Sequence, residues 1–184
     1  MSYGRDLTML TLMDGGSSQL TLNRIYEHRQ LSTVKYLYET KCSHVPLQKG
    51  VYFVVVPDLF EVTFSTSTTA IREHMGQSLL YDPDMLKCKF SKTDKRILYI
   101  GKASGERNRL RRRLWQLVRY GYGEAQNHMG GRALWQINNA PQLLIGYLPC
   151  EQATQAEAKL LREYFNRFET LPLANRQLPQ NRAH

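Results

Sequence analysis

One stretch constrains the fold of this chain more than any other, and it begins at residue 97. The run Ile97-Leu-Tyr-Ile-Gly-Lys102 places four β-prone residues before a glycine. Residues 107–120 then change the pattern, because their apolar members follow the i, i+4, i+7, i+8 spacing of a helix. We therefore predict a strand, a tight turn and a helix in immediate succession.

The predicted helix is rich in arginine. At about 100° per residue, Arg111 and Arg112 point away from its apolar stripe, whereas Arg113 lies along one edge. Between residues 101 and 132, one Lys and seven Arg stand against two Glu, so this segment holds +6 of the net charge of +9. Such a run is often only a solvated helix face, but a cluster beside a glycine turn favours a phosphate-binding surface. The candidate DNA-binding residues are Arg107, Arg109, Arg111, Arg112, Arg119 and Arg132.

The composition narrows the class of protein. A chain of 184 residues, 42% of them hydrophobic, suffices for one domain with a buried core and is short for two. Its basic excess indicates a polyanionic partner, because Lys and Arg release counterions when they meet phosphates. The three cysteines form no Cys-x-x-Cys pair, which argues for a reducing compartment and against disulfides or structural zinc. Since the sequence has neither a signal-peptide pattern nor a membrane-length apolar run, we expect a cytoplasmic protein with no membrane partner.

Other segments carry secondary-structure signals. The apolar run at residues 51–56, bounded by Gly50 and Pro57, predicts a buried strand, and residues 142–148 predict another. Residues 154–169 predict a helix with an apolar stripe. Weaker patterns predict a hairpin over residues 7–22 and short helices over residues 31–39 and 71–80.

Two tripeptides suggest a family. Gly50-Val51-Tyr52 and Tyr99-Ile100-Gly101 resemble the paired signature of GIY-YIG nucleases, which include intron homing endonucleases, the incision subunit of excision repair and some restriction enzymes. Leu110-Arg-Arg-Arg113-Leu resembles the family's next helix, in which an arginine precedes an aliphatic residue. One tripeptide is a weak signal, but two with this helix, a later glutamate and a terminal asparagine are fairly specific together. The resemblance covers about residues 48–177.

The resemblance implies an α+β fold. We expect a three-stranded antiparallel sheet from residues near 51–56, 97–101 and 142–148, flanked by the helices that carry Arg113 and Glu157. The expected domain spans residues 48–177, after an N-terminal extension at 1–47 and before a polar tail at 178–184. The two tripeptides usually lie close together in the family, so residues 58–95 form an insertion, which we expect outside the catalytic sheet where it shapes access of the target.

Glu157 has two competing interpretations. A helical wheel places it inside the apolar stripe, whereas Glu163 falls on the opposite face. Thr154-Gln-Ala-Glu157 also matches a capping box, in which the glutamate would only bond back to the start of the helix. The resemblance implies the other role, because the family's metal-ligand glutamate is likewise followed by two aliphatic residues. We favour the metal ligand, since a carboxylate in an apolar stripe needs a cation or donors.

The resemblance adds further residues to the site. Asn175 is similar to the asparagine that closes the family's site, although asparagine after proline is also ordinary turn chemistry. His128 could relay a proton, although a lone histidine in a glycine-rich loop is more often a turn residue. Some members carry a histidine four residues after the helix arginine, where this chain has Leu117. The base would then be a tyrosine, His128 or metal-bound water, with Lys102 helping a tyrosine to act.

The resemblance implies metal-dependent hydrolysis of DNA phosphodiester bonds. One divalent cation, Mg²⁺ or Mn²⁺, would bind Glu157 and a phosphate oxygen. Tyr52 and Tyr99 would orient or deprotonate the attacking water, while Arg113 would hold the scissile phosphate. Two rivals remain. The chain could be a non-catalytic nucleic-acid-binding module that kept the fold and the basic surface, or an interaction protein whose arginine helix is only solvated. The target, the role and the oligomeric state are not readable from the sequence.

Overall fold

The structure, a computed structural model, describes residues 20–107, 109–124 and 129–179. Most of the predicted N-terminal hairpin and the end of the polar tail lie outside these residues. The helices are α1 (Leu22–Tyr26), α2 (Val34–Glu39), α3 (Pro83–Ser91), α4 (Leu110–Gly121) and α5 (Ala153–Phe168), with 3₁₀ helices η1 (Met129–Gln136) and η2 (Ala140–Gln142). The strands are β1 (Ser32–Thr33), β2 (Gly50–Val55), β3 (Glu73–His74), β4 (Gln77–Ser78), β5 (Ile97–Ala103) and β6 (Leu144–Pro149).

The central sheet is antiparallel and has the order β1-β6-β2-β5. The fully buried β2 lies between β6 and β5, and its register with β5 pairs Tyr52 with Gly101 and Val54 with Tyr99. The α+β class and the three predicted strands are therefore confirmed. The sheet has a fourth strand, however, because the two residues of β1 pair with β6. So short a segment carries no alternation that the sequence could have revealed.

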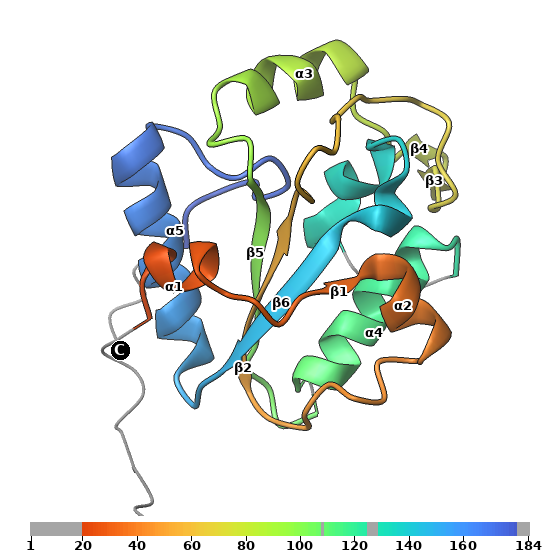
Figure 1. The fold of residues 1–184 in the computed structure, drawn as a ribbon. Coiled ribbons are helices and arrows are strands. Elements are labelled where there is room, and N and C mark those ends of the chain that lie inside the picture. The colour runs from red at the N-terminus through yellow and green to blue at the C-terminus, as the bar shows by residue number, and fades with distance from the viewer. Residues whose placement is uncertain (1–19, 108, 125–128, 180–184) are drawn as a thin grey trace, which may run out of the picture.

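Helices cover both faces of this sheet (Figure 1). On one face, Tyr52 and Val54 pack with residues of α2 and α4, including Leu110, Leu114 and Leu117. On the other face, Val51, Phe53 and Val55 pack with residues of α1 and α5, including Leu160, Leu161 and Tyr164. The predicted helices at 31–39, 107–120 and 154–169 are confirmed as α2, α4 and α5. The apolar stripe of each helix thus finds a face of the sheet.

The segment at 58–95 differs from its prediction. The helix predicted over residues 71–80 is wrong, because β3 and β4 form a hairpin there. Met75 and Gly76 have φ values of 51° and 74°, the left-handed conformation that a two-residue hairpin turn requires. The helix of this segment is α3, where the Asp82 side chain accepts a hydrogen bond from the Asp84 amide at 2.8 Å and Pro83 begins the first turn.

The segment lies outside the central sheet, as predicted, but it is tied to the rest of the molecule. Figure 1 shows α3 beyond one end of the sheet. From α3, the Lys89 ammonium donates hydrogen bonds to the carbonyl oxygens of Leu173 at 2.8 Å and Asn175 at 2.7 Å. Within the described residues, no helix is both long and apolar enough to span a membrane.

Candidate active site

The ring of Tyr52 lies across Gly101 on the neighbouring strand. A Cβ placed on Gly101 would lie 2.6 Å from Cζ and 2.7 Å from the hydroxyl of Tyr52. Only glycine leaves room for the ring, so the two tripeptides of the sequence meet here as one packing unit. This contact carries the Tyr52 hydroxyl from the central strand to β5, which is the edge strand of the sheet.

Tyr52, Tyr99 and Arg113 form a hydrogen-bonded group. The two tyrosine rings lie 5.9 Å apart between centroids, and Tyr99 and Arg113 both make hydrogen bonds to Tyr52. Burial raises the pKa of both phenols; the hydrogen bond between them opposes this rise in Tyr52 and adds to it in Tyr99. This is the pattern expected if Tyr99 donates the hydrogen bond and Tyr52 accepts it. Arg113 also donates from Nη1 to the Gln116 side chain at 2.9 Å, and this bond orients the guanidinium.

Burial decides the protonation of both phenols. Desolvation raises the pKa of Tyr52 above its ordinary value of 10.0 and outweighs the opposing effect of the Arg113 charge. Desolvation raises the pKa of Tyr99 further, and Tyr52 adds to the rise. Both hydroxyls are therefore protonated near neutral pH, so they are suited to orient a water or a phosphate and poorly suited to act as bases in the free protein.

Glu157 approaches this group from α5. Its carboxylate lies 2.8 Å from the Lys102 ammonium, and its side chain is only 14% exposed. Its charge raises the pKa of both Tyr52 and Tyr99, so it lies close to them around the edge of β5. The capping-box interpretation does not fit this geometry. The N-cap of α5 is Gln152, Thr154 lies inside the helix, and the Glu157 carboxylate pairs with a strand residue instead.

This cluster offers one ligand that suits a hard divalent cation. Glu157 is the carboxylate that the cluster supplies, and a Mg²⁺ site of this kind takes one or two carboxylates, phosphate oxygens and waters. Within the described ranges, no group of three or more His, Cys, Asp or Glu side chains is placed to hold a metal ion. Because the Glu157 carboxylate already pairs with the Lys102 ammonium at 2.8 Å, a metal cation bound by Glu157 would have to replace that ammonium.

Asn175 lies beside Tyr99 but uses its amide to bind the backbone. Its Oδ1 accepts from the Ile100 amide at 3.0 Å, and its Nδ2 donates to the Ile100 carbonyl at 2.8 Å. The Ala174 amide donates to the Leu98 carbonyl at 2.8 Å, so this segment pairs with the outer edge of β5. The same segment and Tyr99 line an open pocket of about 340 Å³. Asn175 therefore holds the edge strand in place, rather than presenting its amide to a ligand.

The predicted DNA-binding arginines divide into two groups. Arg107 and Arg112 are exposed, as expected. Arg109, Arg111 and Arg119 are half-buried and bind their own chain, and the exposed Arg112 also donates to the Arg107 carbonyl at 3.3 Å. Arg109 donates to the Leu47 carbonyl at 2.9 Å, Arg111 donates to the Val45 carbonyl at 2.7 Å, and Arg119 pairs with Glu124. The outward direction predicted for Arg111 is wrong, because its side chain is half-buried.

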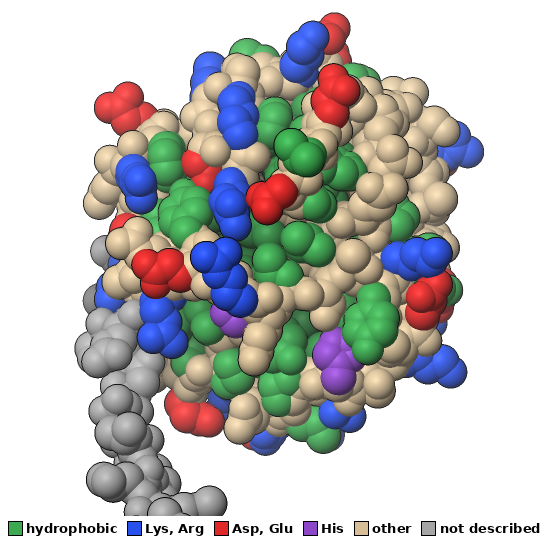
Figure 2. Space-filling view, in the orientation of Figure 1, with side chains coloured by type: hydrophobic (Ala, Val, Ile, Leu, Met, Phe, Trp, Pro, Cys, Tyr) green, Lys and Arg blue, Asp and Glu red, His purple; other side chains and the backbone are tan. Residues whose placement is uncertain are grey.

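The arrangement of charge elsewhere is mixed. On the face drawn in Figure 2, Lys and Arg side chains are interspersed with Asp and Glu instead of gathering into one patch. Arg132 belongs to η1 and is half-buried. His128 lies outside the described residues, so its predicted role stays a prediction.

The sequence patterns do not indicate several residues that lie at or near the candidate site. Lys49 and Glu106 form an ion pair at 2.8 Å beside the start of α4, Gln116 orients Arg113, and Lys89 holds the Asn175 segment. The position of Lys49 directly before the first tripeptide could have indicated the first of these. Comparisons with protein-family models, with curated proteins and with solved structures find no match, so a function for this chain is argued from its site alone.

Proposed function

We propose that this chain is a metal-dependent DNA endonuclease with a GIY-YIG type of site. The observation that carries the proposal is the gathering of Tyr52, Tyr99, Arg113, Lys102 and Glu157 around one edge strand. These residues come from two strands and two helices that cover opposite faces of the sheet. A packing role alone would not require two phenols, a guanidinium and an ion pair at one place.

Each residue has a chemical role in this proposal. Arg113, half-buried and oriented by Gln116, would bind two oxygens of the scissile phosphate through its planar fork. Tyr52 and Tyr99, with their raised pKa values, would orient the attacking water by hydrogen bonds. The water oxygen would form the new bond to phosphorus as the bond to the leaving sugar oxygen breaks. The water would lose a proton to solvent, and the leaving oxygen would take up a proton from solvent to become a hydroxyl group.

Glu157 would hold the divalent cation, whose charge stabilises the phosphate and the leaving oxygen during the reaction. Lys102 has two roles in turn. In the free protein it neutralises the carboxylate, and with DNA bound its ammonium would lie against the substrate backbone. Its side chain is one third exposed, so it can reach solvent-borne phosphates without unfolding the strand.

The test is cleavage of supercoiled plasmid with Mg²⁺ or Mn²⁺ at equal DNA occupancy. Wild type should cut, and EDTA should stop it. Arg113→Ala should lose about a hundredfold or more in rate, whereas its exposed neighbour Arg112→Ala should lose only binding. If none of the proteins cuts plasmid, branched or single-stranded DNA while all bind it, the chain is a binding module and the nuclease proposal fails.

A further inference from the structure

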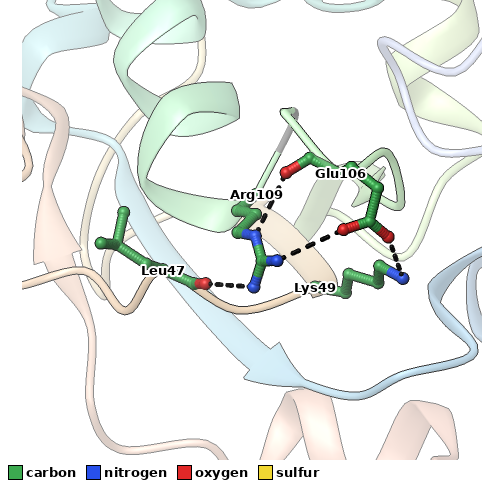
Figure 3. A network of polar contacts seen from close by, with 4 residues as sticks. All are labelled: Leu47, Lys49, Glu106 and Arg109. Carbon is green, nitrogen blue, oxygen red and sulfur yellow. Dashed lines mark hydrogen bonds and ion pairs between the residues drawn. The ribbon is translucent and has the colours of Figure 1, made fainter.

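A small ion-pair network lies where β5 leads into α4 (Figure 3). The Glu106 carboxylate lies 2.8 Å from the Lys49 ammonium and 3.4 Å from Nη2 of Arg109. Arg109 also donates to the Glu106 backbone carbonyl at 3.2 Å and to the Leu47 carbonyl at 2.9 Å. One carboxylate therefore lies against two cations that come from different parts of the chain.

The two cations are more buried than the carboxylate that lies between them, since the Arg109 side chain is 42% exposed. The Leu110 amide donates to the Gln48 carbonyl at 2.9 Å and the Arg111 amide to the Pro46 carbonyl at 3.3 Å, so the start of α4 is tied to the segment that carries Lys49. The Lys49 side chain is 24% exposed, whereas that of Glu106 is 75% exposed. An exposed ion pair contributes little to stability, so an incoming anion can displace Glu106 at little cost.

The network is also close to the candidate active site. Val51 of β2 pairs with Lys102 of β5. Lys49 lies two residues before Val51, directly before the start of β2, so extending the register places Lys49 diagonally across from Lys102. Diagonal neighbours of this kind are about 7–8 Å apart. Phosphates of one DNA strand advance about 3.4 Å per nucleotide along the helix axis. If one phosphate of a DNA strand lies at Lys102, a phosphate one or two nucleotides further along the strand therefore lies near Lys49.

We propose that Lys49 and Arg109 form a seat for a DNA backbone phosphate beside the cleavage site, which Glu106 occupies until DNA displaces it. The inference rests on the proposed action on DNA. The ligand is a phosphodiester because one ammonium and one guanidinium can donate to its two non-bridging oxygens, and its negative charge takes the place of the displaced Glu106 carboxylate. The seat reads no bases, so it would position the strand without selecting a sequence.

The test is DNA binding in EDTA, where no cleavage is needed. Glu106→Gln should bind a short duplex about two- to fivefold more tightly than wild type. Asp58→Asn is the matched control, since Asp58 is an exposed carboxylate that pairs with Arg96 at the opposite end of β2 and β5. It removes the same charge away from the seat, so its effect should be clearly smaller.

Lys49→Met tests the seat from the other side. The methionine keeps most of the buried stem and removes the charge, so the slope of log K against log salt should become shallower by about 1. In the Lys49→Met background, Glu106→Gln should tighten binding clearly less, because only Arg109 then remains for Glu106 to neutralise. The seat is overturned if Glu106→Gln and Asp58→Asn have equal effects, or if Glu106→Gln acts equally with and without Lys49. A chain that binds in this pattern but never cuts loses the nuclease proposal and keeps the seat.

Discussion

The Tyr52 ring occupies the space that a side chain at Gly101 would fill, at 2.6 Å from a Cβ placed there. The first tripeptide supplies the Tyr52 phenol, and Gly101 of the second leaves the space through which the ring reaches the edge strand. This packing contact explains why the two segments depend on each other.

Gly101→Ala tests this relationship. The added methyl group must displace the Tyr52 ring or part β2 from β5, so the free energy of unfolding should fall by about 1–3 kcal/mol. Cleavage should fall by more than the loss of folded protein explains, because the phenol moves. Urea unfolding and plasmid nicking measure the two effects. Tyr52→Phe keeps the ring and should lower cleavage with little loss of stability. Wild-type stability and activity in Gly101→Ala would refute the contact.

Stability at alkaline pH follows from the buried phenols. Burial raises the pKa of Tyr52, Tyr99 and Tyr164 above 10.0, so the folded state keeps protons that the unfolded chain loses. The stabilising effect is complete below about pH 10 and is lost as pH rises from there towards the folded pKa values. These phenols should leave the melting temperature unaffected up to about pH 10 and lower it above that, and thermal unfolding between pH 8 and 11 measures the fall. A fall that begins near pH 8 would contradict the assigned burial.

Lys89 links the segment at residues 58–95 to the candidate site. Its ammonium satisfies the carbonyls of Leu173 and Asn175, and its burial lowers its pKa. Lys89→Met should leave both carbonyls short of a donor and cost about 1–3 kcal/mol, whereas Lys87→Met, on the exposed side of α3, should cost little. Chemical denaturation of both variants measures the difference. Equal stabilities would show that the insertion is not tied to the Asn175 segment.

The pH dependence of the same link has a definite sign. Because the folded pKa of Lys89 is below the ordinary 10.5, the unfolded chain binds more protons in the window between the two values. This residue therefore makes the protein more stable as pH rises through that window. Lys89→Met should remove that rise while keeping the later tyrosine-driven fall, and an unchanged profile would contradict the burial of the ammonium.

Periodicity predicted the elements that bury a continuous apolar run or stripe. β2, β5, β6, α4 and α5 all followed from this signal, and the nearness of Tyr52, Tyr99, Arg113 and Glu157 followed from the resemblance. Local chemistry that periodicity does not register was missed. Asp82 and Pro83 begin α3, and the positive φ values at Met75 and Gly76 form a turn within the predicted helix.

The sequence also does not show contacts between side chains and distant backbone. Arg109 and Arg111 donate to the carbonyls of Leu47 and Val45, and Asn175 binds the backbone of Ile100. A helical wheel gives the direction of a side chain but not the carbonyl that it meets, because that carbonyl is more than 60 residues away and is placed by the tertiary fold. Sequence patterns therefore do not show which of these arginines are also bound to their own chain.

In the proposed mechanism, Glu157 acts in catalysis and is not merely the ion-pair partner of Lys102. The most direct measurement compares metal-dependent plasmid nicking by Glu157→Ala and Glu163→Ala, two carboxylate deletions on the same helix, at equal DNA occupancy and equal folded fraction. Glu157→Ala should lose cleavage by about a hundredfold or more, while Glu163→Ala should keep it. Cleavage by Glu157→Ala at the rate of Glu163→Ala would contradict the proposed site.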